Sequence, residues 1–123
     1  MVAVHPDADA FTALTVMRRN EVRHLPVVVD QRCVGILTES DLVRGLASGR
    51  SAAELTAEEL CHSPAPSVPA GSSLQTMANA MIDADVDALI LVSRGVMVGM
   101  VTSTDVLGAV TAKWREASAP AVR

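Results

Sequence analysis

The sequence predicts an α+β fold made of two copies of a β-α-β-β-α unit, and three observations carry this prediction. The chain repeats itself at a shift of 64 residues, which indicates two copies of one structural unit. Its apolar residues alternate between helical spacing and short runs rich in β-branched side chains. Half of its 123 residues are hydrophobic and 20% are charged, so the chain is long and apolar enough to form one compact domain.

The repeat is the strongest of these observations. Residues 7–42 align with residues 71–106 without a gap. The identical positions in the first copy are Thr12, Met17, Val22, Leu25, Val28, Val34, Gly35, Thr38 and Asp41. Chance similarity rarely keeps one register over such a span, so we interpret the pattern as a tandem duplication.

The first strand and first helix of each unit follow from short apolar runs and from helical spacing. Brief strands are expected at Ala3-Val4 and, in the second copy, at Ser67-Val68. In residues 7–20, an aspartate that can cap a helix precedes apolar residues at helical spacing. These apolar residues are Ala10, Ala13, Leu14 and Met17. The counterpart segment begins with Ser72 and Gln75, which have the spacing of a capping box.

A hairpin and a second helix complete each unit. Two β-branched runs, Leu25–Val29 and Cys33–Leu37, flank the turn residues Asp30-Gln31-Arg32 and predict a hairpin. The second copy repeats this pattern with Leu89–Val92 and Val96–Val101. After each hairpin a Thr-x-x-Asp sequence opens a helix, and these helices are expected at Asp41–Leu46 and Asp105–Trp114.

The residues between the copies predict a loop and a short helix. The loop is expected at Gly45–Ser51. Ser51 and Glu54 have capping-box spacing and predict a helix that ends near Leu60. We therefore assign residues 1–50 to the first repeat and residues 51–116 to the linker helix and second repeat. Residues 117–123 are expected to be a disordered tail of this single module.

Composition and charge argue against nucleic acid as a partner and against a membrane-spanning helix. Ten basic and fourteen acidic side chains give a net charge of −4, the wrong sign for binding nucleic acid phosphates. One Phe, one Trp and no Tyr leave little aromatic surface for stacking bases. No apolar run approaches the roughly 18–20 residues of a membrane helix. Two cysteines and an N-terminus unlike a signal peptide lead us to expect a reduced, cytoplasmic protein.

The repeated motifs resemble those of the cystathionine β-synthase (CBS) domain. The sequence Leu-Pro-Val-Val-Val-Asp at residues 25–30 is followed by Gly-Ile-Leu-Thr-Glu-Ser-Asp-Leu at residues 35–42. The second copy departs from the pattern, with Ile90 in place of the usual proline and Val106 in place of leucine. The resemblance extends from about Val2 to Lys113. It implies a tandem CBS pair, or Bateman module, whose repeats pack sheet to sheet about a pseudo-twofold axis.

The resemblance also implies two clefts between the repeats, where adenine nucleotides or related adenosyl ligands bind. The implied residues of the first cleft are Arg23, His24, Thr38, Ser40 and Asp41, with Val68, Ala70 and Val86 as an apolar slot for the adenine. The implied residues of a second, weaker cleft are Thr102, Thr104 and Asp105.

The chemistry of these residues agrees with such a role. Hydroxyls at a helix N-terminus lie beside free N–H groups that attract a phosphate, and a carboxylate accepts hydrogen bonds from both ribose hydroxyls. Gly35 and Gly99, which lack a Cβ, would let a ligand approach the strand backbone. The alternative is structural: Asp41 and Asp105 are ordinary helix caps, which we favour for Asp105, and the apolar residues are core.

The two clefts are expected to differ in charge. Arg23 and His24 precede the second strand of the first copy, where both can donate hydrogen bonds to a phosphate. The counterpart positions hold Asp87 and Ala88. We expect Asp87 to lie in the other cleft and to repel a phosphate there, so that only the first cleft binds nucleotide well. The alternative for Arg23 and His24 is the solvated start of a strand.

Metal and catalytic sites are not expected. The histidines and cysteines lack metal-ligand spacing: His5, His24, His62, Cys33 and Cys61. No nucleophile motif and no pair of catalytic carboxylates is present. We therefore expect a regulatory module, not an enzyme, that requires no cofactor, senses ATP, ADP or AMP and signals to a partner protein that the sequence does not identify. The alternatives are a structural dimerisation module with empty clefts, an S-adenosylmethionine-type ligand, or an enzyme whose nucleophile is not recognised.

A homodimer is expected from the apolar helices. The segments that would present an apolar face are Ala10–Met17, Asp41–Leu46, Leu74–Met81 and Val106–Trp114. Family members commonly join through such helices into a flat disc, and Trp114 near the chain end is placed to reach the partner subunit.

Overall fold

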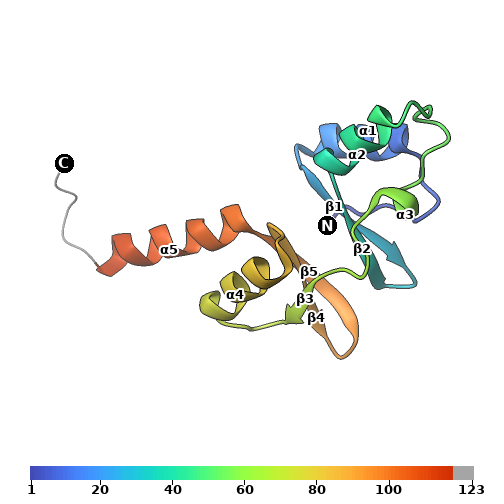
Figure 1. Ribbon diagram of the computed structural model, residues 1–123. Helices are drawn as coiled ribbons and strands as arrows, with labels where there is room; N and C mark the ends of the chain where they lie inside the picture. Colours follow the sequence, from blue (N-terminus) through green and yellow to red (C-terminus); the bar gives the residue numbers. More distant parts are fainter. Residues whose placement is uncertain (118–123) are drawn as a thin grey trace, which may run out of the picture.

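The computed structural model describes residues 1–117, with side chains described as far as Thr111. It confirms the α+β class and the two units (Figure 1). The first unit and the linker contain α1 (Ala10–Asn20), β1 (His24–Val29), β2 (Arg32–Thr38), α2 (Glu39–Ala47) and α3 (Ala57–Leu60). The second unit contains β3 (Ser67–Pro69), α4 (Leu74–Ala84), β4 (Ala88–Ser93), β5 (Val96–Thr102) and α5 (Ser103–Ala117).

Both predicted hairpins are present, and they share their irregularities. β1 pairs antiparallel with β2, and β4 pairs antiparallel with β5. The register shifts between Val27 and Val28 in one hairpin and between Leu91 and Val92, the aligned positions, in the other. Both hairpin turns have two consecutive residues with positive φ, Asp30-Gln31 and Arg94-Gly95, as two-residue type I′ turns require. The duplication therefore extends to the backbone conformation.

The brief first strand differs between the units. In the second unit, β3 lies parallel to β4, as expected for Ser67-Val68. In the first unit, the predicted strand at Ala3-Val4 is reduced to one parallel bridge between Val4 and Val27. The Val4 N–H donates to the Pro26 carbonyl, and the Val28 N–H donates to the Val4 carbonyl.

Two predicted capping boxes are wrong. Ser73, not Ser72, caps α4, because the Ser72 hydroxyl donates to the Pro69 carbonyl at 2.6 Å and is not available for the helix. The Ser51 carbonyl accepts from the Glu54 N–H at 3.0 Å and closes a turn; the helix begins only after Thr56, which caps α3. The predicted loop Gly45–Ser51 is shorter than expected, since α2 continues to Ala47.

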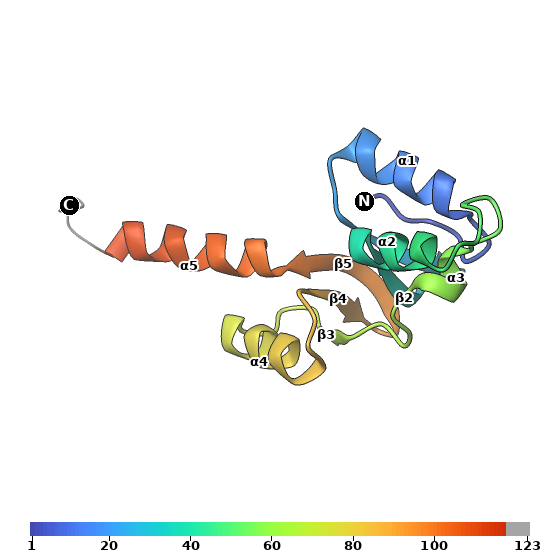
Figure 2. The same ribbon diagram turned by 45° about the horizontal axis from the view of Figure 1, so that its top comes forward.

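Three groups of buried apolar side chains form the core. One lies between α1, α2 and the first hairpin, with Leu25 and Leu37 fully buried, and a smaller one surrounds Leu89 in the second unit. The third joins the two sheets and contains Ile36 of β2 with Ala88 and Ile90 of β4. The sheets thus meet in the middle of the molecule, with the helices outside them (Figure 1, Figure 2).

The linker crosses β2 at Gly35 and continues toward the second unit. Ile36 and His62 exchange backbone hydrogen bonds of 3.1 and 3.0 Å, so the linker runs antiparallel along the edge of β2. A Cβ built on Gly35 would lie 2.5 Å from Cys61 Sγ and 2.7 Å from the His62 carbonyl oxygen. Gly35 therefore accommodates the linker, and the expectation that its open face admits a ligand is wrong.

The last helix, α5, extends away from the rest of the molecule (Figure 1, Figure 2). The side chain of Trp114, expected at the dimer contact, lies outside the described residues, as does the expected tail beyond Ala117. In the part of the chain that the structure describes, no helix combines the length and the apolar character needed to cross a membrane.

Replacing Gly35 and Gly99 by alanine tests the crossing of β2 by the linker. Gly35→Ala is expected to lower the free energy of unfolding by about 1–3 kcal/mol, because the new methyl group overlaps Cys61 and His62. Gly99→Ala is the matched control. Its Cβ would lie 3.5 Å from Leu91 Cδ1, an ordinary contact, so any change is expected to be stabilising and no more than about 1 kcal/mol. Urea denaturation compares the two, and equal destabilisation would contradict the close approach at Gly35.

Candidate functional site

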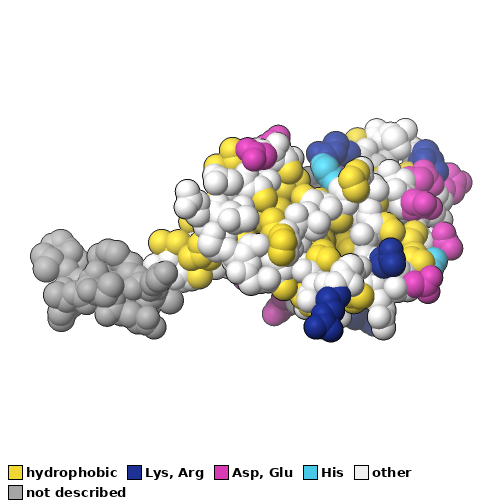
Figure 3. All heavy atoms as spheres, turned by 90° about the horizontal axis from the view of Figure 1, so that it is seen from below, with side chains coloured by type: hydrophobic (Ala, Val, Ile, Leu, Met, Phe, Trp, Pro, Cys, Tyr) yellow, Lys and Arg dark blue, Asp and Glu magenta, His cyan; other side chains and the backbone are white. Residues whose placement is uncertain are grey.

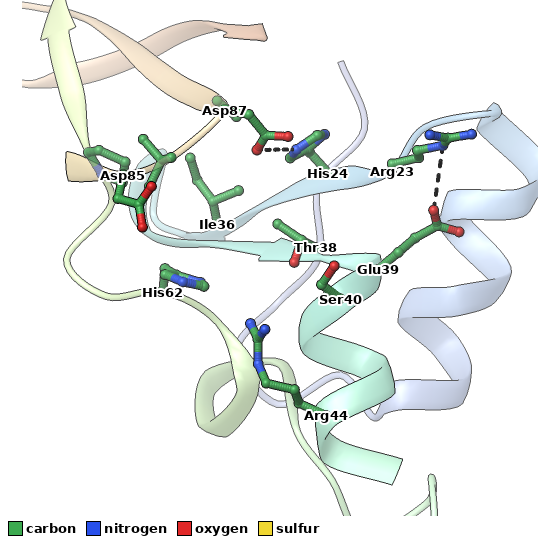
Figure 4. Close-up of a pocket in the computed structure, with 13 residues that line it drawn as sticks. Arg23, His24, Ile36, Thr38, Glu39, Ser40, Arg44, His62, Asp85 and Asp87 are labelled. Atoms are coloured by element: carbon green, nitrogen blue, oxygen red, sulfur yellow. Dashed lines mark hydrogen bonds and ion pairs between the residues drawn. The ribbon is translucent and has the colours of Figure 1, made fainter. Parts of the chain in front are cut away.

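A cavity of about 510 Å³ lies between the two repeats (Figure 4). The first repeat contributes residues from β1, β2 and α2, the linker contributes His62 and Pro66, and the second repeat contributes residues 85–88. Its lining consists of Arg23, His24, Ile36, Thr38, Glu39, Ser40, Arg44, His62, Pro66, Asp85, Val86, Asp87 and Ala88. A second cavity of about 510 Å³ adjoins it and shares Arg44, His62, Pro66 and Val86.

The structure brings five of the implied ligand-binding residues into the first cavity. They are Arg23, His24, Thr38, Ser40 and Val86. Asp41 lines the adjoining cavity. Val68 and Ala70 line neither of them: Val68 lies in the core of the second repeat, and Ala70 is an exposed residue after β3 whose N–H donates to the Val92 carbonyl.

The N-terminus of α2 places two hydroxyls in the cavity. Thr38 caps the helix, and its side-chain oxygen accepts from the Asp41 N–H at 3.1 Å. The Asp41 carboxylate accepts in return from the Thr38 N–H at 2.9 Å, which completes a capping box. Ser40 lies between them and lines the cavity. The structural alternative for Asp41, a helix cap, is therefore present in the fold, beside the cavity that the ligand-binding role requires.

Asp41 is buried and its second carboxylate oxygen is also engaged. Its side chain is only 2% exposed. The Oδ1 atom accepts from the Arg44 guanidinium at 2.5 Å and lies 3.3 Å from His62 Nδ1. Arg44 and His62 are themselves about half exposed or more and border both cavities. Figure 4 shows them reaching the cavity from different elements, α2 and the linker.

Arg23 and His24 are paired with carboxylates as well. Arg23 Nε lies 3.5 Å from Glu39 Oε1, and the Arg23 side chain is largely in solvent. His24 is mostly buried, and its Nε2 lies 2.9 Å from Asp87 Oδ1, which joins the first repeat to the second (Figure 4). Asp87 therefore lines the same cavity as Arg23, and the expectation that it lies in a separate cleft is wrong. The reason is that the start of β1 and the start of β4 face each other across the contact between the repeats.

The counterpart motif in the second repeat is a helix cap. Asp105 Oδ2 accepts from the Thr102 N–H at 2.9 Å and from the Thr102 hydroxyl at 3.0 Å. Thr102, Thr104 and Asp105 line neither of these two cavities, nor a smaller third cavity of about 210 Å³ near Cys33 and Met97. The cap that we favoured for Asp105 is present.

Several lining residues were not among those expected from the sequence: Glu39, Arg44, His62, Pro66 and Asp85. Arg44 follows Asp41 by three residues on one helix, so the i,i+3 pairing was a usable signal. His62 had no such signal, because its place beside Asp41 depends on the path of the linker. The adjoining cavity has a mixed wall: Leu60, Cys61, Pro64, Pro66, Ala84 and Val86 are apolar, and Asp41, Arg44, His62 and Ser63 are polar.

The two thiols are unsuited to nucleophilic chemistry. Burial raises the pKa of Cys61, and the negative charge of Asp41 raises it further. Burial likewise raises the pKa of Cys33. Both are therefore neutral thiols near pH 7 and act as small apolar groups. Among the described residues, no three histidine, cysteine or acidic side chains come together in the manner of a metal site.

Comparison with known proteins gives matches over most of the chain. The model of the family described as CBS domain matches residues 1–48 and 57–112. Hypoxic response protein 1 of Mycobacterium tuberculosis is 36% identical over 92 residues, which cover 73% of this chain and 64% of that protein. This chain thus spans less than two thirds of the length of that relative.

Solved structures share the fold. A crystal structure of Hypoxic Response Protein I with two coordinated zinc ions is 31% identical with a TM-score of 0.78, and the match covers 88% of this chain and 89% of that one. The CBS domain pair of protein MJ0100, in complex with 5′-methylthioadenosine and S-adenosyl-L-methionine, has a TM-score of 0.81 at 23% identity, covering 91% and 89%.

Alkylation kinetics test the state of the thiols. Because burial raises the pKa of Cys33 and of Cys61, the thiolate fraction at a given pH is smaller in the folded protein than in the unfolded chain. The midpoint of the rate–pH profile for iodoacetamide is expected to lie at higher pH for the native protein than for the urea-unfolded chain. Mass spectrometry assigns the rate to each cysteine. A native midpoint at or below the unfolded one would contradict the assignment.

Proposed function

The chain belongs to the CBS domain family as a tandem pair, a regulatory module, and on that basis we propose that it binds an adenine nucleotide between its repeats and signals to a partner protein. The role is one of sensing, with no catalytic step. The partner is a protein of unknown identity. The thiols of Cys33 and Cys61 are both free, which suits a reducing, cytoplasmic setting.

One observation carries the proposal: the inter-repeat cavity combines groups that can bind a phosphate with an adjoining cavity whose wall is partly apolar. Thr38 and Ser40 present hydroxyls at the N-terminus of α2, where the helix dipole favours an anion. Arg44 adds a guanidinium to the same wall. The apolar side chains in the wall of the adjoining cavity, such as Leu60, Ala84 and Val86, can pack against a purine base. Protein MJ0100, which has the same fold, binds adenosyl ligands, and this supports the ligand class.

The charges of the cavity narrow the ligand class to a nucleoside monophosphate or, as a second candidate, an S-adenosylmethionine-type ligand. Glu39, Asp85 and Asp87 oppose Arg23 and Arg44 in its lining, so carboxylates outnumber guanidinium groups. Such a balance disfavours a triphosphate and suits either a monophosphate or a cationic sulfonium of the S-adenosylmethionine type. We place AMP first among the nucleotides for this reason. The second motif, Thr102, Thr104 and Asp105, is proposed to bind weakly or not at all.

No zinc is carried over from Hypoxic Response Protein I to this chain. Asp41 Oδ1 lies 3.3 Å from His62 Nδ1, but the Asp41 carboxylate already accepts from Thr38 and Arg44. Burial and the Asp41 charge also raise the pKa of the Cys61 thiol, whereas a zinc ligand must be a thiolate.

Serine 40 and its counterpart provide a matched test of nucleotide binding. Ser40→Ala removes a hydroxyl from the cavity without disturbing the cap, which Thr38 supplies. It is expected to weaken AMP binding about two- to tenfold, the effect of one hydrogen bond. Thr104→Ala, the equivalent change in the second repeat, is expected to leave the affinity unchanged. Isothermal titration with AMP, ATP, adenosine and S-adenosylmethionine measures affinity and stoichiometry, and one site per chain is expected.

Two outcomes would contradict the proposal. No heat and no thermal shift with any of these ligands at millimolar concentration would favour a structural module with empty clefts. Loss of binding on Thr104→Ala with no effect of Ser40→Ala would place the ligand at the second motif.

We further propose that the chain forms a homodimer through its exposed helical face. α2 exposes Val43 and Leu46, and α5 exposes Leu107 and Val110 at the aligned positions; these four side chains are each 48–66% exposed. Phe11 of α1 and Ile82 of α4 are also exposed. Figure 3 shows the opposite side of the molecule, seen from below and away from α1 and α2, where hydrophobic side chains also reach the surface. A second copy related by a twofold axis would cover the exposed helical face.

Charged substitutions test the dimer. Val43→Glu combined with Leu107→Glu is expected to convert a dimer into a monomer, because two carboxylates per chain would be buried without partners. Ala53→Glu, on the exposed linker turn, is the control and is expected to remain dimeric. Light scattering after size-exclusion chromatography at tens of micromolar gives the mass. A wild-type monomer under these conditions would overturn the proposal.

A further inference from the structure

Both oxygens of the Asp41 carboxylate already accept hydrogen bonds within the protein. Oδ2 accepts from the Thr38 N–H at 2.9 Å within the capping box, and Oδ1 is occupied by Arg44 at 2.5 Å, with His62 at 3.3 Å. The side chain is 2% exposed, so solvent does not compete for either oxygen. A ligand that approaches Oδ1 therefore competes with the Arg44 guanidinium, which already binds this oxygen.

Arg44 is the group best placed to leave. Its side chain is 66% exposed and borders both cavities, so the guanidinium has space to turn away from Asp41. The Oδ2 contact is part of the helix cap and its loss would unwind the start of α2. His62 is held by the backbone pairing of the linker with Ile36, which limits its movement.

We propose that Arg44 is a specificity-determining residue that selects phosphorylated adenosine over adenosine, an inference that rests on the proposed function. Arg44 would exchange the Asp41 carboxylate for the phosphate of the ligand. The ribose hydroxyls replace the guanidinium on Asp41 Oδ1, and the released guanidinium binds the 5′-phosphate of the same ligand. Within one nucleotide the two groups lie close enough for a single arginine side chain, pivoting on its stem, to reach from one to the other.

The selectivity arises from the balance of charge-assisted hydrogen bonds. AMP gives Arg44 a phosphate in place of the carboxylate, so the number of ion pairs is conserved. Adenosine takes Asp41 away from Arg44 and supplies no anion in return. Arg23 does not perform this role, because it pairs with Glu39 and its side chain is 84% exposed.

As far as its side chains are described, the second repeat lacks an arginine that pairs with the aspartate of its motif. The position aligned with Arg44 is Gly108, which carries no side chain, and the exposed Asp105 pairs only with Thr102 among the described residues. The two Thr-x-x-Asp motifs thus differ in whether an arginine forms an ion pair with their carboxylate.

Titration of AMP and adenosine against Arg44→Gln tests the exchange. The glutamine amide can still donate to Asp41, so the local hydrogen bond is kept while the charge is lost. AMP affinity is expected to fall on the order of tenfold to hundredfold, while adenosine affinity stays the same or rises, so that the ratio of the two approaches one. Arg50→Gln is the control: Arg50 pairs with Glu59 and lines none of the three cavities, and its ratio is expected to match the wild type.

The outcomes separate this inference from the proposed function. Suppose that the wild type binds both ligands and that Arg44→Gln weakens both equally or leaves both affinities unchanged. The proposed exchange at Arg44 is then wrong, while the nucleotide site stands. If wild type binds neither ligand, the proposed function fails and the exchange fails with it. Arg44→Lys provides a second variant if Arg44→Gln does not fold: it keeps the charge and is expected to retain a preference for AMP over adenosine.

Discussion

The pair of backbone hydrogen bonds between Ile36 and His62 is the constraint on which the rest of the site depends. It holds the linker along the edge of β2 at a point where only glycine, at position 35, leaves room for Cys61. From there the chain can continue into β3, which lies parallel to β4 of the second repeat. The same pairing sets His62 beside Asp41 and brings Pro66 to the wall of the cavity. The linker is thus part of the cavity wall as well as a connection between the repeats.

The contact between the sheets sets the second boundary of the site. Ile36 packs with Ala88 and Ile90, so the starts of β1 and β4 lie face to face. This brings His24 within 2.9 Å of Asp87, a polar contact between the repeats at the cavity wall. Any ligand that competes for His24 or Asp87 would alter the contact between the repeats. The contact between the repeats and the cavity wall therefore share the same two side chains.

The cavity is not basic, although four basic side chains line it. Each basic side chain in its lining lies within 3.5 Å of a carboxylate: Arg23 with Glu39, His24 with Asp87, and Arg44 and His62 with Asp41. An anionic ligand would compete with these carboxylates for the same cations, so its net gain would be smaller than at an unpaired cation. Discrimination between related ligands follows from such competition more readily than high affinity does.

The sequence alone determined the duplication, the α+β class, both hairpins and the Thr-x-x-Asp caps. These features are local, because turns, helix caps and strand alternation depend on residues a few positions apart, and the repeat shows each of them twice. It identified Thr38, Ser40 and Arg23 at the cavity, since each is tied to a motif. The tertiary structure alone decided that Asp87 shares this cavity and that Asp41 is buried beneath Arg44 and His62. Those contacts join segments far apart in the chain, and the packing of the two sheets and the path of the linker, which no local pattern encodes, bring them together.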